Sequence, residues 1–128
     1  MASGTTELRL VVTAEDFDEA VRIYRDVLGM PELMAVSSSG GRVVILDAGR
    51  ATLELADPPH AANIDEVEVG RRVAGHIRVA LEVADVSGVT QRLTDEGLTL
   101  IAAPVPTPWG SVNSRLSGPA NLQLTLFE

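Results

Sequence analysis

LRLVVTAEDFDEAVRIYRDVLG, residues 8–29, decides the fold, because residues 76–97, HIRVALEVADVSGVTQRLTDEG, repeat its order. In each stretch a short apolar strand leads through an aspartate, Asp16 or Asp85, into an amphipathic helix that ends at a glycine. These two aspartates lie 69 positions apart, and the apolar positions that follow them match in spacing. The chain therefore contains two copies of one unit, and internal repetition is typical of a duplicated fold.

Three further strands are expected after each helix, where apolar runs alternate with glycine- and proline-rich turns. The predicted strands are 8–13, 32–36, 42–47 and 51–56 in the first half, and 76–83, 98–105, 111–116 and 122–127 in the second. The predicted helices are 14–28 and 85–96. The buried face of the first helix is expected to carry Phe17, Ala20, Val21, Tyr24, Val27 and Leu28.

The whole chain, residues 1–128, is expected to form one domain of two modules, 7–57 and 76–128. Residues 58–75 between them are polar and are interpreted as a linker. His60 lies in the Pro/Ala-rich start of this linker and is expected to be solvated.

Composition excludes several classes of function. The net charge of −8 argues against nucleic acid and anionic membrane surfaces as partners. There is no cysteine, which excludes disulfides, thiolate metal sites and cysteine nucleophiles. No apolar run approaches the length of a membrane span, so a cytoplasmic location is the expectation.

Three short motifs, in order, carry a resemblance to a known family. They are Tyr24-Arg25-Asp26-Val27-Leu28-Gly29-Met30, Glu82-Val83-Ala84-Asp85-Val86 and Pro108-Trp109-Gly110. The chain resembles the vicinal oxygen chelate superfamily, which includes glyoxalases, dioxygenases and bleomycin-resistance proteins. The resemblance implies an α+β fold in which two tandem β-α-β-β-β modules form a curved mixed sheet around a ligand cavity. It also implies a homodimer.

Alternation along the strands places polar residues on one face, which is the cavity face. Metal-dependent members of the family carry ligands at four positions of this face, and here those positions hold Arg9, Glu54, Arg78 and Thr125. Arginine cannot ligate a divalent cation, so neither a metal nor another cofactor is expected. A different metal set, drawn from His76, Glu54 and Glu128 with Glu82 nearby, stays open.

The same four residues allow two interpretations that are compatible. Glu54 could bridge Arg9 and Arg78 as a structural ion-pair network, since an unpaired buried charge is costly. Alternatively, the arginines could contact a carboxylate, phenolate or carbonyl of a ligand. Trp109 and Phe127 would then supply apolar contacts.

The sequence thus favours a small-molecule-binding protein without a metal, which sequesters an antibiotic or other natural product in its cavity. Its candidate ligand-binding residues are Arg9, Glu54, Arg78, Trp109, Thr125 and Phe127. The alternative is an enzyme, a glyoxalase-like lyase, isomerase or dioxygenase with a displaced or absent metal site. A third interpretation is a scaffold module with a closed, ion-paired cavity.

Overall fold

The computed structural model describes residues 4–119 and 122–128, whose strands form one eight-stranded mixed sheet in the order β2-β3-β4-β1-β5-β8-β7-β6. The strands are β1 (Thr5–Thr13), β2 (Glu32–Ser38), β3 (Gly41–Asp47), β4 (Thr52–Ala56), β5 (Ile77–Val83), β6 (Thr99–Pro106), β7 (Val112–Ser117) and β8 (Gln123–Phe127). Each half has the same internal order, and the antiparallel pair β1–β5 joins the two halves. The predicted α+β fold of two β-α-β-β-β units is confirmed.

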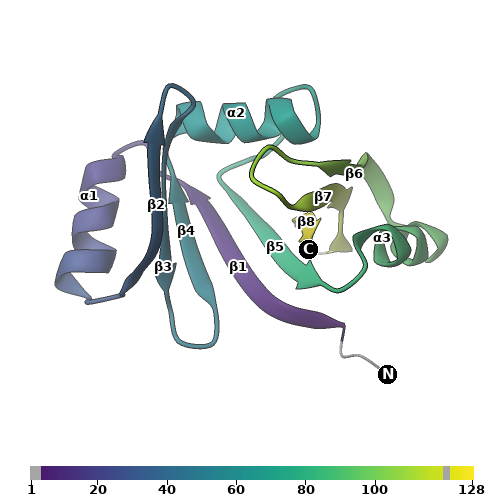
Figure 1. Cartoon of the computed structure of the whole chain (residues 1–128), viewed down its shortest axis with the longest axis horizontal. Helices are drawn as coiled ribbons and strands as arrows, with labels where there is room; N and C mark the ends of the chain where they lie inside the picture. Colours follow the sequence, from purple (N-terminus) through teal and green to yellow (C-terminus); the bar gives the residue numbers. More distant parts are fainter. Residues whose placement is uncertain (1–3, 120–121) are drawn as a thin grey trace.

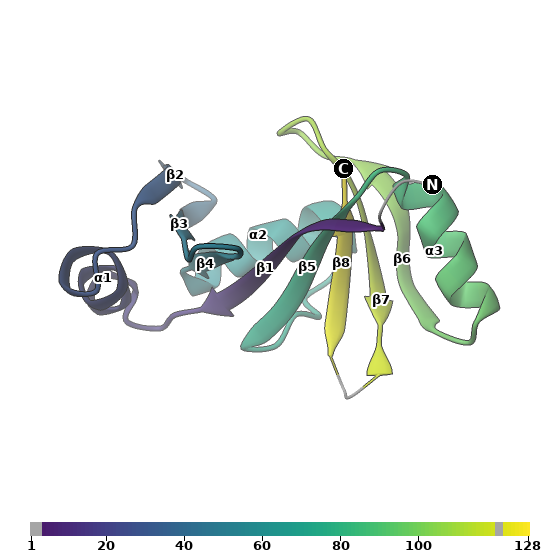
Figure 2. The same ribbon diagram turned by 90° about the horizontal axis from the view of Figure 1, so that it is seen from below.

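The helices occupy three separate places on this sheet. They are α1 (Phe17–Val21), which continues as the π-helical turn η1 (Arg22–Val27), α2 (Pro58–Glu68) and α3 (Val86–Asp95). Figures 1 and 2 show α1 and α3 at opposite ends of the molecule, with α2 between the two halves. Within the described ranges, none of the helices has the length and hydropathy that a membrane crossing requires.

Each half has its own apolar core between its sheet and its helix. In the first half, Phe17 and Val21 of α1 pack on Val44, Leu46 and Leu55. In the second half, Val86 of α3 packs with Val83, Leu116 and Leu126. An aspartate side chain begins each helix by accepting a hydrogen bond from the backbone amide three residues later, at Asp16 and at Asp85.

The predicted buried face of the first helix is correct only for its first turns. Phe17 and Val21 are buried, but Tyr24, Val27 and Leu28 are exposed. The chain changes to π-helical bonding here, with the Leu28 amide donating to the Ile23 carbonyl at 2.8 Å. Because the spacing of 3.6 residues per turn no longer holds, the later apolar positions turn away from the core.

The predicted linker is not an irregular segment, because α2 occupies most of it. Asp57 and Pro58 start this helix: the Asp57 carboxylate accepts hydrogen bonds from the His60 amide at 2.9 Å and the Arg42 amide at 3.0 Å. The start of α2 lies so close to β3 that a Cβ on Gly41, whose φ is 105°, would stand 2.3 Å from the His60 nitrogen. This helix therefore docks on the sheet at a position that requires glycine.

Candidate functional site

A cavity of about 400 Å³ lies on the face of the sheet opposite α1 and α3, and both halves of the chain line it. All six side chains predicted to contact a ligand lie in its wall: Arg9, Glu54, Arg78, Trp109, Thr125 and Phe127. They come from four strands and one turn, and side-chain alternation along the strands brings them to one face. The structure adds three lining residues from α2, which are His60, Ile64 and Glu68.

The two halves contribute walls of different chemistry. The first half supplies mainly apolar side chains, which are Val11, Met34, Val36, Val43 and Ile45. The second half supplies mainly polar ones, which are Arg78, Ser111, Asn113 and Thr125. A ligand in this cavity therefore meets an apolar surface on one side and hydrogen-bonding groups on the other.

Arg9 is held by neighbours on the sheet. Its guanidinium contacts the Glu7 carboxylate at 3.1 Å and the Thr52 hydroxyl at 3.2 Å. Its Nη1 lies 3.6 Å from Glu54 Oε1, and its guanidinium stacks over the Phe127 ring at 4.9 Å. This cation is already paired, which leaves it little capacity for a ligand's charge.

Arg78 is in the opposite situation. It is only 8% exposed, and among the described residues its side chain makes one hydrogen bond, from Nη1 to Thr125 Oγ1 at 2.8 Å. Of the ion-pair network that was one of the two interpretations, the Arg9–Glu54 contact is present at 3.6 Å. No ion pair joins Glu54 to Arg78 within the part of the chain that the structure describes. Burial lowers the pKa of Arg78, and the positive charge of Arg115 lowers it further.

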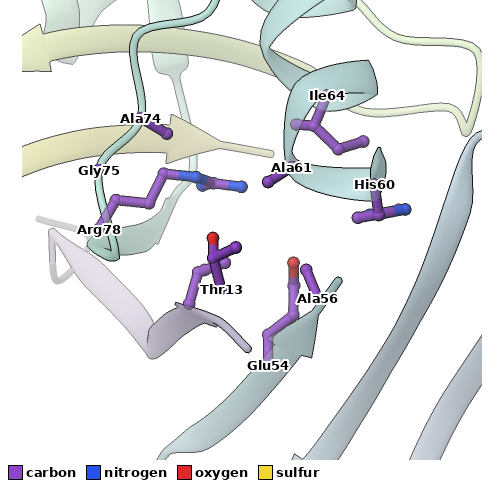
Figure 3. Close-up of a pocket in the computed structure, with 10 residues that line it drawn as sticks. Thr13, Glu54, Ala56, His60, Ala61, Ile64, Ala74, Gly75 and Arg78 are labelled. Carbon is purple, nitrogen blue, oxygen red and sulfur yellow. The ribbon is translucent and has the colours of Figure 1, made fainter. Parts of the chain in front are cut away.

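A recess of about 10 Å³, which is room for one water molecule, lies between α2 and the sheet. Glu54, Arg78 and His60 line both this recess and the large cavity. Figure 3 shows the Glu54 carboxylate and the Arg78 guanidinium pointing into the space beneath α2 from different strands, with Thr13 between them. The two opposite charges thus face one gap without touching.

His60 is a functional candidate that the sequence analysis missed, since it was assigned to a solvated loop. It lies on the first turn of α2 and is half-buried in the cavity wall. Burial lowers the pKa of its imidazole, although the charges of Glu54 and Asp57 oppose this shift. His60 is therefore neutral at pH 7 and can accept a proton. The Asp-Pro-Pro sequence before it is a helix-start pattern that would have placed it.

A buried ionic network behind the cavity was also missed. Arg115 is fully buried and contacts Asp65 and Glu68 of α2, both at 2.8 Å. Asn113 donates a further hydrogen bond to Glu68 at 2.8 Å, and Arg72 pairs with Asp65 at 2.7 Å. Burial alone would raise the pKa of Asp65, but hydrogen bonds from backbone amides and from these arginines outweigh it and lower the pKa. This network fixes α2 to the second half.

The four positions at which the family carries metal ligands do not fit a divalent cation. Arg9 and Arg78 cannot ligate, and Thr125 Oγ1 accepts the hydrogen bond from Arg78. Glu54 alone is a suitable ligand, and one carboxylate does not make a metal site.

The alternative metal set of His76, Glu54 and Glu128 is not assembled. No group of three or more histidines, aspartates or glutamates with a metal-binding arrangement occurs in residues 4–119 and 122–128. Glu128 Oε2 instead accepts a hydrogen bond from the Val86 amide at 2.8 Å, at the start of α3. Glu82 accepts one from a threonine hydroxyl of β1 at 2.6 Å.

Trp109 lies at the edge of the cavity. It occupies the turn between β6 and β7, which is closed by a hydrogen bond from the Thr107 amide to the Ser111 carbonyl at 2.8 Å. The indole lines the cavity and is still 49% exposed. It can contact both a bound molecule and solvent, which makes it a usable fluorescence reporter.

Comparison with known proteins places this geometry in a family. The family model described as Glyoxalase/Bleomycin resistance protein/Dioxygenase superfamily matches residues 8–126. No curated protein matches the chain.

Similar solved structures agree on the fold. A hypothetical protein from Bacillus halodurans C-125 has a TM-score of 0.71 and 16% identity, over 99% of this chain and 95% of that one. Methylmalonyl-CoA epimerase from Mycobacterium tuberculosis has a TM-score of 0.66 and 20% identity, over 100% of this chain and 92% of that one. A 4-hydroxymandelate synthase mutant from Streptomyces coelicolor has a TM-score of 0.64 and 21% identity, over 97% of this chain and 38% of that one.

Proposed function

Since the chain belongs to the glyoxalase/bleomycin resistance protein/dioxygenase superfamily, we propose that it binds a small organic molecule in its cavity without a metal centre. In its simplest form this activity sequesters an antibiotic or other natural product. The observation that carries the proposal is the cavity itself: about 400 Å³, apolar on one side and polar on the other. Sites for small molecules have this volume and this mixture of surfaces.

A thermal-shift screen of natural-product antibiotics and small carbonyl compounds tests this proposal. A compound that binds the folded state raises the melting temperature by mass action. Ala80 lines the cavity and is buried, so Ala80→Phe should fill the space and abolish the shift. Ala62→Phe, at an exposed position of α2, is the matched control and should keep it. Hits that stabilise both variants equally would refute binding in this cavity.

A second candidate function is proton transfer, which one observation favours. His60, neutral at pH 7, and Glu54 line the same cavity as the buried Arg78. His60 could take a proton from a C–H beside a carbonyl while Arg78 stabilises the resulting oxyanion, and return it to the same carbon. Two of the similar structures are named as an epimerase and a synthase.

Hydrogen exchange separates this candidate from sequestration. A thermal-shift hit with such a C–H is incubated with the protein in D₂O, and deuterium incorporation is followed by mass spectrometry. Catalysis predicts incorporation that His60→Gln removes, whereas sequestration predicts none.

We further propose that the protein is a homodimer, located in the cytoplasm. The support for the dimer is an apolar surface formed by η1 and the edge strand β2, with Val27, Leu28 and Leu33 exposed. Light scattering of the wild type should give the mass of two chains, and Leu33→Lys should shift it to one.

A further inference from the structure

Glu54 and Arg78 are buried, opposite charges that face the same recess and do not form an ion pair with each other. Each side chain belongs to a residue that is 8% exposed, and each lines both the recess and the cavity. Glu54 accepts no hydrogen bond from any described residue, and its ion pair with Arg9 is long, at 3.6 Å. From the described part of the chain, Arg78 has the Thr125 hydroxyl as its one hydrogen-bond partner. Buried charges with so few partners are costly unless a bound molecule supplies the missing ones.

The charges around this gap limit what can bind there. Glu7, Arg9, Glu54 and Arg78 are two carboxylates and two guanidinium groups, so their sum is zero. Behind them Asp65, Glu68, Arg72 and Arg115 also sum to zero and are paired with one another. A bound group that carries net charge would add an uncompensated charge to a buried site, which is unfavourable. A group that is neutral overall, with an acceptor for Arg78 and a donor for Glu54, meets every requirement.

We propose that the inner end of the cavity binds the zwitterionic head of an amine-bearing carboxylate, such as an α-amino acid, between Arg78 and Glu54. This inference rests on the proposed function, because it assumes that the cavity binds a small organic molecule. The carboxylate accepts hydrogen bonds from the Arg78 guanidinium, and the ammonium donates to the Glu54 carboxylate. The apolar remainder of the molecule lies along Val11, Val43 and Ile45.

Four probes with one phenyl group and different heads test the head chemistry. They are phenylalanine, 3-phenyllactate, 3-phenylpropionate and 2-phenylethylamine, and binding is followed by protein-detected NMR at millimolar probe. Phenylalanine should bind best, since it has both charged groups. Phenyllactate should follow, because its hydroxyl is a weaker donor to Glu54 and its head is anionic. The last two, which lack the donor or the acceptor, should bind more weakly by about tenfold or more.

Substitutions of the two charged residues test the location. Arg78→Met and Glu54→Gln should each weaken phenylalanine binding by more than about tenfold. Arg78→Met should also remove the preference for phenylalanine over 2-phenylethylamine, which lacks the carboxylate. Glu54→Gln should remove the preference for phenylalanine over 3-phenylpropionate, which lacks the ammonium. Arg92→Met and Glu15→Gln, at exposed positions outside the cavity, are the matched controls and should leave binding unchanged.

The melting temperature without probe separates a ligand-binding role from a structural one. If Arg78 is present for a ligand, the desolvation of its charge is uncompensated in the free protein. The double variant Arg78→Met/Thr125→Val, which also removes the hydroxyl that Arg78 bonds, should then melt at the same temperature or higher. A much lower melting temperature would show that Arg78 is structural and would overturn the inference. Equal binding of the four probes, or none by any of them, would overturn it as well. Thermal-shift hits that still occupy the cavity would in that case leave the proposed function intact.

Discussion

The two halves of the molecule are alike on the side that packs against a helix and unlike on the side that faces the cavity. On the packed side Leu46 and Leu55 of the first half correspond to Leu116 and Leu126 of the second, and all four are buried in the two cores. On the cavity side, Ile45 pairs with Glu54 in the first half. The corresponding pair in the second half is Arg115 with Thr125.

This difference shows which constraint acts on each side. The packed side must match an apolar helix face, so both copies keep large aliphatic residues there. The cavity side of the second half holds Asn113 and Arg115, which pair with Glu68 and Asp65 of α2. That helix has no counterpart in the repeat. Its start docks on β3 of the first half, where Asp57 accepts a hydrogen bond from the Arg42 amide, and its later turns pair with buried polar side chains of the second half. The asymmetry of the cavity thus follows from the docking of a single unrepeated helix.

Removal of Arg115 should have the largest effect on this asymmetry. Arg115→Met keeps the bulk of the side chain but leaves Glu68 buried without its cation, and leaves Asp65 with Arg72 as its one remaining cation among the described residues. A buried pair broken on one side costs about 3–5 kcal/mol, so the free energy of unfolding in urea should fall by that amount. The loss should be concentrated in α2, where amide hydrogen exchange should become faster.

The control for this variant is an ion pair on the surface. Arg22 pairs with Glu19 at 2.7 Å, and both side chains are about half exposed. Arg22→Met should therefore change the stability very little, because exposed pairs contribute little. A similar small change for Arg115→Met would mean that α2 does not depend on the network.

The core of the second half also differs from the first at one pair of positions. Val21 and Val44 pack together in the first core. Their counterparts are Thr90 and Ser114, whose hydroxyls share a buried hydrogen bond of 2.8 Å. Thr90→Val and Ser114→Ala should each cost about 1–3 kcal/mol, because each leaves one buried hydroxyl without its partner. The double variant removes both hydroxyls and should cost less than the sum.

A double-mutant cycle of urea unfolding measures this coupling. Additive losses would show that the two hydroxyls do not depend on each other. In that case the hydrogen bond between Thr90 and Ser114 would not be the reason that the second core tolerates their hydroxyls.

The repeat and the cavity face could be predicted from the sequence because both depend on local periodicity. Arg9, Glu54, Arg78, Thr125 and Phe127 were placed by counting alternate residues along strands, and all line the cavity. Their possible contact with a ligand remains a prediction.

The errors of the sequence analysis arise where periodicity does not apply. Tyr24 and Leu28 were assigned to the core by a spacing of 3.6 residues, which the π-helical turn breaks. The contacts of Arg115 join residues 47 and 50 positions apart, and no local pattern indicates such pairs. The helix that carries His60 has no pronounced apolar face, so only its Asp-Pro start could have indicated it.

Substitution of His60, on that unrepeated helix, should change the stability least among the three sets of variants, and only in one pH range. Burial lowers the pKa of His60 below its ordinary value of 6.5. As the pH falls through 6.5, the unfolded chain binds a proton before the folded protein does, so stability is lost until the folded pKa is reached. His60→Gln should remove this loss, which is seen by measuring the melting temperature from neutral pH downward. His76→Gln, at an exposed strand end, should keep the wild-type profile.

Below pH 3.8 the wild type and both variants should lose stability together, because Asp57 and Asp65 have lowered pKa values in the folded state. If His60→Gln and wild type lose stability in parallel above that range, then α2 does not hold a neutral imidazole in the cavity wall, and the proton-transfer candidate loses its base.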